Sequence, residues 1–279
     1  MENNTQEFRQ LSAGPFSFKV YNAAQTSFGV ASVIIYGQKD AVLIDAQFTL
    51  ADAEKVAREI KDLGKNLTTI YISHGDPDFY FGLQVFKTYF PDVTAYASPA
   101  TVEHIKATAQ KKLDVWSRNL GKAITSNVVL PQVLPGSSLE LEGQQLEIVG
   151  LQDFPTNTFV WIPSAEAVVG GINVFGNTFH LWMADAQTHE ARARWVFVLD
   201  RIASLKPRIV VPAHSTSDAD FNLTSVTHTI DYIIFYEDAL KQCTTSESLV
   251  NALKQKYPTA GFETALQLGA KVNTGEMKW

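Results

Sequence analysis

The stretch that decides the fold reads Tyr71-Ile-Ser-His74-Gly-Asp76-Pro-Asp78-Phe-Tyr-Phe-Gly82. It follows a β-branched and aromatic run, residues 68–72, which predicts a buried strand, and its glycines and proline mark where that strand ends. His74, Asp76 and Asp78 stand at alternating positions immediately after the strand. A loop at the carboxyl end of a strand can aim several short side chains at one point, and all three are metal-ligating types. We therefore expect the functional site to be built around this loop.

The composition of the chain narrows the class of protein. Its 279 residues are enough to bury a large core as one domain. A single cysteine, Cys243, excludes an intramolecular disulfide and a thiolate-rich zinc cluster, so a metal would be held by imidazole and carboxylate groups. The net charge of −6 and the scattered lysines and arginines argue against nucleic acid as a partner. The polar, acidic start and the lack of a membrane-length apolar run predict a cytoplasmic protein without a membrane partner, acting on a small molecule.

Two halves of similar order follow one another along the chain. The first half, about residues 15–125, is predicted to contain strands at 16–21, 28–36, 41–45, 68–72 and 93–97 and helices at 49–64, 80–89 and 99–120. The second half, about residues 135–215, is predicted to contain strands at 139–143, 145–149, 158–162, 167–169 and 207–214 and a helix at 188–205. Further helices at 222–240, 246–256 and 261–268 are expected to pack on the outside or to make the subunit contact of a homodimer.

Each half ends its inner strand in a histidine, His74 in the first half and His214 in the second. This pseudo-repeat predicts one domain, residues 1–279, with a site where the halves meet, because ligands usually bind in clefts between such halves. Asp45 ends a strand behind that site. It is expected to be structural, since a short carboxylate there can bond loop backbone.

Three segments resemble the metallo-β-lactamase superfamily in order and spacing, namely residues 40–45, 69–82 and 203–214. The resemblance implies an α/β fold of the αββα sandwich type, with a metal site along one edge of the sandwich. It also implies a hydrolase that uses one or two zinc ions.

The first metal-binding motif departs from the superfamily pattern. That pattern reads His-x-His-x-Asp-His, whereas this chain has His74-x-Asp76-x-Asp78-Phe79. An aspartate therefore replaces the second histidine, and a phenylalanine replaces the last one. Because carboxylates favour harder ions than imidazoles do, Mn²⁺ or Fe²⁺ is an alternative to Zn²⁺.

The remaining ligand positions are only partly filled. His214 matches the final histidine of the superfamily, and anchoring on Pro155 places Asp153 at the preceding histidine position, with Gln152 as the adjacent alternative. The bridging aspartate of the superfamily falls on Ile172, so that ligand is missing. The resemblance thus implies the following metal-binding residues: His74, Asp76, Asp78, Asp153 and His214.

Two arrangements of the metal remain open. In one, a single ion is held by four side chains: His74, Asp76, Asp153 and His214. Asp78 is then the catalytic residue that orients or deprotonates the attacking water. In the other, two ions remain and Asp185 or His180 is recruited as a ligand. A third interpretation is a non-catalytic scaffold in which Asp78 merely caps the following helix.

Aromatic residues near the site loops predict an apolar pocket. They are Phe79, Tyr80, Phe81, Trp161, Phe175, Phe179 and Trp182. The predicted substrate contacts are Phe79, Tyr80, His180, Trp182 and Asp185. His180, which is flanked by aromatic residues, can equally be a packed core histidine. Such a pocket suits a slender substrate with an aromatic or alkyl tail.

Within the superfamily, the motif of residues 74–82 is similar to the plant-toxin-degrading branch typified by isothiocyanate hydrolase. That similarity implies a detoxification reaction, in which metal-bound hydroxide attacks the electrophilic carbon of R–N=C=S to give an amine and carbonyl sulfide. Hydrolysis of a lactone or thioester is the alternative within the same fold, with Tyr80 or the metal stabilising the oxyanion. The alternative from another class is a protein that binds a hydrophobic ligand in the same cleft without catalysis.

Overall fold

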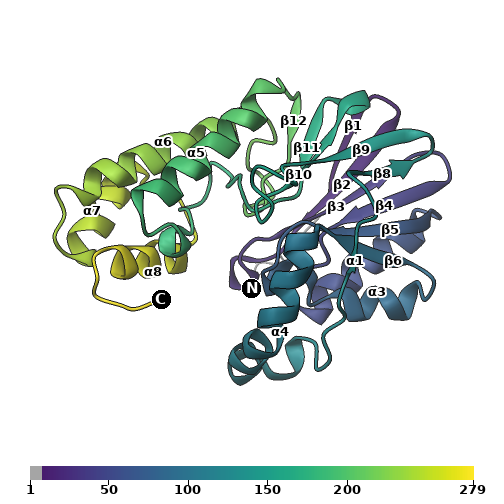
Figure 1. The fold of residues 1–279 in the computed structure, drawn as a ribbon, viewed down its shortest axis with the longest axis horizontal. Coiled ribbons are helices and arrows are strands. Elements are labelled where there is room, and N and C mark those ends of the chain that lie inside the picture. The colour runs from purple at the N-terminus through teal and green to yellow at the C-terminus, as the bar shows by residue number, and fades with distance from the viewer. Residues whose placement is uncertain (1–7) are drawn as a thin grey trace, which may run out of the picture.

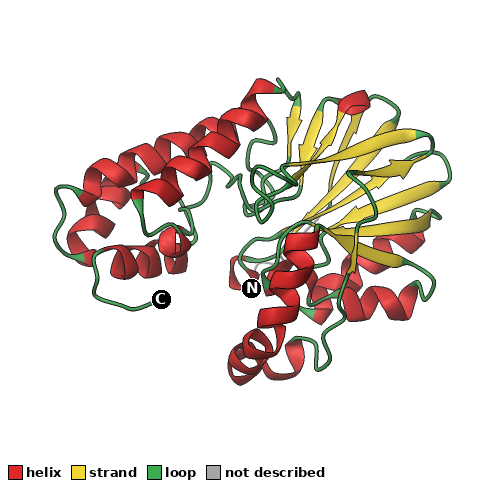
Figure 2. Ribbon diagram, in the orientation of Figure 1, coloured by secondary structure: helices red, strands yellow, loops and turns green. Residues whose placement is uncertain are grey.

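Two β-sheets form the centre of the protein, and the computed structural model describes residues 8–279 of the chain (Figures 1 and 2). The first sheet holds seven strands in sequence order: β1 (Arg9–Ala13), β2 (Phe16–Asn22), β3 (Ala31–Tyr36), β4 (Asp40–Ile44), β5 (Asn66–Ile72), β6 (Thr94–Ala97) and β7 (Gln132–Val133). The second sheet holds five strands in the order β12 (Ile209–Val210), β11 (Ala167–Val169), β10 (Phe159–Ile162), β9 (Gln144–Val149) and β8 (Ser138–Leu141). Strands β1 to β4 form an antiparallel meander, and β4 to β7 pair in parallel.

Successive side chains of a strand point to opposite faces of its sheet, so the buried side chains belong to separate core layers. In β3, Val33 and Ile35 join the core between the two sheets, whereas Ile34 faces the helices on the other side of the first sheet. The second sheet contributes Leu146 and Val160 to the same inner core. Because successive side chains of a strand point to opposite faces, strands buried on both faces have nearly continuous apolar sequences.

Helices cover the outer face of each sheet. The helices on the first sheet are α1 (Leu50–Asp62), α2 (Pro77–Tyr80), α3 (Leu83–Tyr89) and α4 (Pro99–Leu120). Those that share a core with the second sheet are α5 (His189–Ser204), α6 (Leu223–Leu240), α7 (Ser246–Lys256) and α8 (Glu263–Asn273). Figure 1 shows α5 and α6 running away from the β12 end of the second sheet, with α7 and α8 at their far end. The layers are those of an αββα sandwich, and the predicted fold class is confirmed.

Most predicted elements are present, with helix starts where side-chain caps were expected. Thr49 accepts a hydrogen bond from the Asp52 amide, and Thr188 accepts one from the Ala191 amide. Strands β1 and β7 were not predicted, since they are short strands at the two ends of the first sheet. In the part of the chain that the structure describes, none of the helices combines the length and apolar character needed to cross a membrane.

Two predicted elements differ from the structure. The helix predicted at 80–89 is divided into α2 and α3 at Gly82, whose amide donates to the Gln47 carbonyl at 2.9 Å. The strand predicted at 207–214 is reduced to β12. Between β12 and His214, the backbone bonds to other segments instead; for example, the Ala31 amide donates to the Ala213 carbonyl at 2.8 Å. Both differences arise from contacts with segments distant in sequence.

We predict that Gly82→Ala destabilises the fold, since a Cβ at this position would lie 1.9 Å from the Ala46 carbonyl oxygen and 2.6 Å from Ala53 Cβ. Backbone atoms cannot move aside as a flexible side chain does, so the free energy of unfolding should fall by about 1–3 kcal/mol. Urea denaturation measures it. Gly136→Ala is the matched control, because nothing lies within 4 Å of its Cβ position. Equal midpoints for the two variants would contradict the prediction.

Candidate active site

The loop after β5 is fixed by a buried hydrogen-bond network behind it. Asp45 accepts bonds from the Ser73 amide at 2.7 Å and from the Ser73 hydroxyl at 2.6 Å. The same hydroxyl accepts a bond from the Gly171 amide at 2.7 Å. Burial raises the pKa of Asp45 to about 7, while its bonds from Ser73 act in the opposite direction. The structural role predicted for Asp45 is confirmed, because this network joins the ends of β4 and β5 to the loop after β11.

His74 and Asp76 form the first pair of polar side chains at the site. His74 Nδ1 lies 3.4 Å from Asp76 Oδ2, and this nitrogen is buried without a hydrogen-bond partner among the described residues. Burial lowers the pKa of His74, and the nearby Asp76 opposes that shift. Burial acts to raise the pKa of Asp76, but His74 and Lys112 favour its charged form and the net shift is downward.

Lys112 of α4 brings a positive charge to this pair. Its Nζ donates to Asp76 Oδ1 at 2.8 Å and to the Gly75 carbonyl at 2.9 Å. It also lies 3.0 Å from His104 Nε2, which must accept, since an ammonium group can only donate. Lys112 therefore has one acceptor for each of its three protons.

Asp78 and His214 form the second pair, with His214 Nε2 lying 3.8 Å from Asp78 Oδ2. The other ring nitrogen of His214, Nδ1, donates to the Phe28 carbonyl at 3.1 Å. Burial raises the pKa of Asp78 well above its usual value, and the neighbouring Asp76 adds to this shift. Burial lowers the pKa of His214 to about 4, against the effect of its bond to Phe28.

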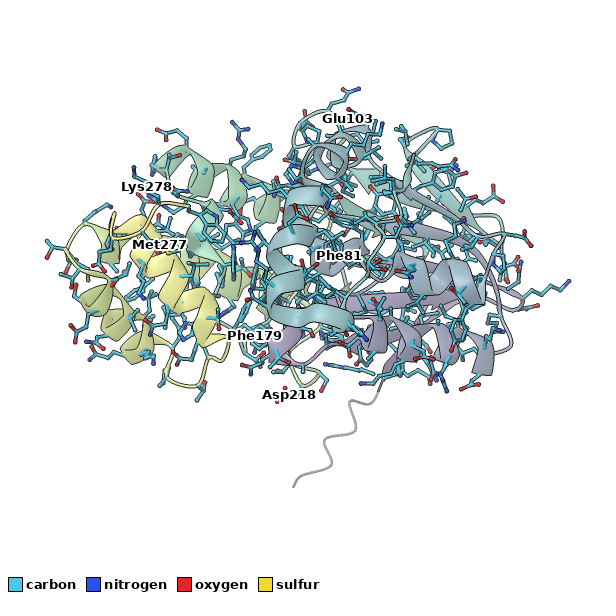
Figure 3. The ribbon with its side chains drawn as sticks, turned by 90° about the horizontal axis from the view of Figure 1, so that it is seen from below. Phe81, Glu103, Phe179, Asp218, Met277 and Lys278 are labelled. Carbon is cyan, nitrogen blue, oxygen red and sulfur yellow. The ribbon has the colours of Figure 1, made fainter. Side chains whose placement is uncertain are left out.

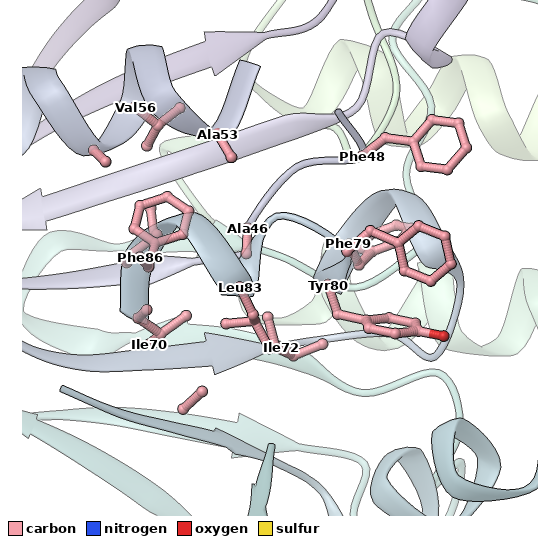
Figure 4. Close-up of a cluster of buried hydrophobic side chains, with 14 of the residues drawn as sticks. Ala46, Phe48, Ala53, Val56, Ile70, Ile72, Phe79, Tyr80, Leu83 and Phe86 are labelled. Atoms are coloured by element: carbon pink, nitrogen blue, oxygen red, sulfur yellow. The ribbon is translucent and has the colours of Figure 1, made fainter. Parts of the chain in front are cut away.

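Phe79 packs against both histidines. Its ring centroid lies 5.3 Å from that of His74 and 5.6 Å from that of His214, with edge-on geometry in each case. Figure 4 shows Phe79, Tyr80 and Phe48 among the buried side chains of the core between the first sheet and its helices. Phe79 and Tyr80 lie outside the set of described residues that line the cavity, so their expected role in substrate binding is not supported by their placement.

The donor groups do not assemble into the metal centre that the resemblance implies. Among residues 8–279, no three histidine, cysteine, aspartate or glutamate side chains are arranged so that they could hold an ion. The structure brings four of the five predicted ligands into one region, but as the separate pairs described above. The residues present therefore do not fit a metal centre with Zn²⁺, Mn²⁺ or Fe²⁺.

The other predicted ligands lie elsewhere or have their own partners. Asp153 is exposed and lies outside the set of described residues that line the cavity. His180 is buried in the helical core and its Nδ1 lies 3.1 Å from the Tyr232 hydroxyl, as expected for a packed core histidine. Asp185 lines the cavity, where its Oδ1 accepts a bond from Trp279 Nε1 at 2.6 Å. Ile172, at the position of the missing bridging aspartate, also lines the cavity.

A cavity of about 1060 Å³ opens beside the two polar pairs. Its aromatic wall consists of Phe28, Trp116, Phe154, Phe175, Trp182, Trp195, Phe262 and Trp279. Of the predicted aromatic set, Phe175 and Trp182 belong to this wall. Phe81 instead packs against Phe48, and Phe179 packs against Phe262. Figure 3 shows Phe179 toward the C-terminal helices and Phe81 toward the first sheet. The predicted apolar pocket is thus present, but mostly with other residues.

Several of these residues gave no signal in the sequence. Lys112 and Trp116 belong to the long helix α4 and line the cavity. The spacing of residues along this helix does not show which of its side chains face a cavity. Phe262 and Trp279 come from the C-terminal region, whose sequence pattern predicts only helices packed on the outside or in a subunit contact. Only the folding of α4 and the C-terminal helices around the loop after β5 brings them together.

Comparisons with known proteins agree with this architecture. A family model described as the metallo-beta-lactamase superfamily matches residues 26–214, and the chain belongs to that superfamily. Members of the superfamily are generally metal-dependent hydrolases. No curated protein matches the chain.

Solved structures show the same fold at low sequence identity. A metallo-beta-lactamase from Pontibacter korlensis is 18% identical, with a TM-score of 0.57, and the match covers 82% of this chain and 98% of that one. The metallo-beta-lactamase IND-7 is 16% identical, with a TM-score of 0.59 and coverage of 83% and 100%. The metallo-beta-lactamase DIM-1 is 16% identical, with a TM-score of 0.54 and coverage of 82% and 97%. These likenesses concern the fold.

We predict that Asp45→Ala weakens the fold and loosens the site loop, because it leaves the buried Ser73 amide without its acceptor. Loss of such a partner should lower the free energy of unfolding by about 1–3 kcal/mol. Denaturant unfolding measures the loss, and hydrogen exchange at the amides of residues 73 and 171 locates it. Asp92→Ala, at an exposed aspartate, is the control. Unchanged exchange at both amides would show that the network does not hold the loop.

Proposed function

We propose that the protein is a hydrolase that acts on a small electrophilic substrate with a hydrophobic tail, and that isothiocyanates are the leading substrate class. The observation that carries this proposal is the aromatic cavity of about 1060 Å³ beside buried histidine and aspartate side chains. Membership in a superfamily of hydrolases supports the reaction type. An apolar wall with a few convergent polar groups is the usual form of a small-molecule site.

The shape of the wall supports a substrate with an aromatic or alkyl tail. Trp182 packs against Phe28 and Phe262, with ring centroids 5.9 and 6.0 Å away, and those two rings also contact each other at 5.9 Å. The three rings therefore form a continuous aromatic surface. Flat rings stack or pack edge-on against such a surface with additional stabilisation beyond their buried area. The reactive carbon of a bound substrate would then lie toward the polar end of the cavity.

Asp78 is proposed as the group that orients and deprotonates the attacking water. Of the two loop carboxylates, Asp76 is engaged at 2.8 Å by the ammonium group of Lys112. Asp78 lies 3.8 Å from the His214 ring and has no ion pair with a lysine or arginine among the described residues, which leaves its oxygens better able to accept a proton from water. Asp78 also lines the cavity.

The proposed reaction needs only water as co-reactant. A water oxygen bonds to the central carbon of R–N=C=S while Asp78 accepts one water proton and passes it to the substrate nitrogen, which gives the thiocarbamic acid R–NH–C(=S)–OH. The hydroxyl proton of this acid then moves to the nitrogen as the C–N bond breaks, giving the amine R–NH₂ and carbonyl sulfide. Because this carbon is already strongly electrophilic, the step needs less stabilisation of an oxyanion than amide hydrolysis does.

We expect Asp78→Asn to lower kcat for benzyl isothiocyanate by about 10²- to 10⁴-fold, the usual contribution of a general base. The assay follows loss of isothiocyanate absorbance together with release of benzylamine. Asp218→Asn, at an exposed aspartate, is the matched control and should keep wild-type turnover.

The same panel includes a γ-lactone and an acyl thioester. Turnover of either one without turnover of isothiocyanates would reject the isothiocyanate proposal and keep the hydrolase. Binding of benzyl isothiocyanate analogues without turnover of any substrate would reject the hydrolase itself.

Trp182→Ala should raise KM for benzyl isothiocyanate by about tenfold or more, because burial of an aromatic tail contributes on the order of 1.5–3 kcal/mol. Methyl isothiocyanate, which has almost no tail, is the matched substrate and should show a much smaller change. Equal changes in KM for the two substrates would place the tail elsewhere.

A further inference from the structure

The loop after β5 carries more negative charge than the superfamily pattern, and a positively charged side chain of the protein pairs with it. Asp76 stands where the pattern has a neutral histidine, and Asp78 follows two residues later. The Asp78 side chain is buried, and that of Asp76 is 31% exposed. Carboxylates removed from water need a cation or hydrogen-bond donors nearby. In the superfamily arrangement a metal ion would be that cation.

In the structure, the ammonium group of Lys112 is the cation nearest to Asp76. Its ammonium group has three acceptors, namely Asp76 Oδ1, the Gly75 carbonyl and His104 Nε2, at 2.8, 2.9 and 3.0 Å. Its side chain is only 22% exposed. A charge held by three acceptors at hydrogen-bond distance is positioned, whereas an ordinary surface lysine is solvated and mobile.

The local backbone is suited to this arrangement. His104 and Lys112 both belong to α4, eight residues apart, so they lie about two helical turns from each other along the helix. Gly75 allows α4 to approach, because a Cβ at this position would lie 2.5 Å from His104 Cδ2. Helix and loop therefore meet closely enough for the ammonium group to bond the loop carbonyl and the Asp76 carboxylate together.

We propose that the ammonium group of Lys112 takes the electrostatic place of a metal ion, so that this site works with an internal cation and excludes divalent ions. A divalent ion at Asp76 would have to displace Lys112 or lie beside a like charge, which is unfavourable in a partly buried site. Phe79 adds to the exclusion, because an apolar ring packs against His74 and His214 where the superfamily has a further ligand.

The inference deepens the proposed function, since it rests on the same site being the place of the chemistry. Its test uses metal ions alone. Failure to hydrolyse isothiocyanates would leave it standing, and a metal-loaded wild type would overturn it without deciding the substrate.

The experiment titrates dialysed, tag-free protein with Zn²⁺ by calorimetry and with Co²⁺ by visible absorption, which reports coordinated ions. Four proteins are compared: wild type, Lys112→Ala, Lys112→Met and Lys106→Ala. Lys112→Met keeps most of the side-chain stem without its charge. Lys106→Ala is the matched control, because it removes a lysine from the exposed face of the same helix, where Lys106 pairs with Glu103.

We expect wild type and Lys106→Ala to hold less than about 0.1 ion per chain, and the Lys112 variants to bind roughly one ion at least tenfold more tightly than wild type. Removal of the ammonium group frees Asp76 and His104 to rotate. As they stand, these two side chains and His74 do not hold an ion, but rotation would let all three bind one, and they are donor types that Zn²⁺ accepts. A wild-type protein that retains about one ion or more after dialysis would overturn the proposal. It would also be overturned if the Lys112 variants bound no more metal than Lys106→Ala. Retention of an ion by the wild type would overturn the proposal even if a variant is unstable.

Discussion

The hydroxyl of Ser73 is the contact on which the geometry of the site depends. It donates to Asp45 behind the first sheet and accepts from the Gly171 amide in the loop that leaves the second sheet. Gly171 has a left-handed backbone, and a Cβ there would lie 2.3 Å from the Thr158 carbonyl oxygen, so the loop can take this path only with glycine. One buried hydroxyl thus fixes the loop of the first half against that of the second, and His74 is the next residue along the chain.

Once the loop is fixed, electrostatics determine which side chains must surround it. Asp76, Asp78 and Asp185 all line the same cavity, where Asp78 is buried, Asp76 is half-buried and Asp185 is exposed. Lys112 balances the first of these carboxylates, and the indole of Trp279 donates to the third. The helix α4 and the C-terminal segment are therefore parts of the site, although both lie far in sequence from its central loop. Side chains of α4 and of the C-terminal segment line the cavity together with the carboxylates of the loop after β5.

The sequence was sufficient for features that depend on local pattern. The caps at Thr49 and Thr188, the helix at 99–120 and the two meanders were predictable, because each needs only neighbouring residues. Features that depend on distant contacts were not. The break at Gly82 requires the carbonyls of Ala46 and Gln47, and Lys112 is one of two adjacent lysines on a long helix whose pattern does not say which one turns to the loop. The prediction of Asp153 as a metal ligand rests on its spacing to Pro155, and spacing does not show that this side chain is exposed.

The departures from the superfamily motif are mutually consistent. Phe79 and Ile172 replace polar ligands with apolar side chains, one buried against two imidazoles and the other in the cavity wall. Asp76 replaces a neutral ligand with a charged one and is paired with Lys112. A loop that had merely lost its ligands would leave Asp76 without a partner, yet this carboxylate accepts a hydrogen bond from Lys112. One polar atom in the cavity wall, His74 Nδ1, is buried and lacks a hydrogen-bond partner among the described residues. Buried polar atoms of this kind need an explanation. In the wall of a cavity, a polar group of a bound ligand is a natural partner for such an atom, and this agrees with the proposed placement of the reactive carbon at the polar end.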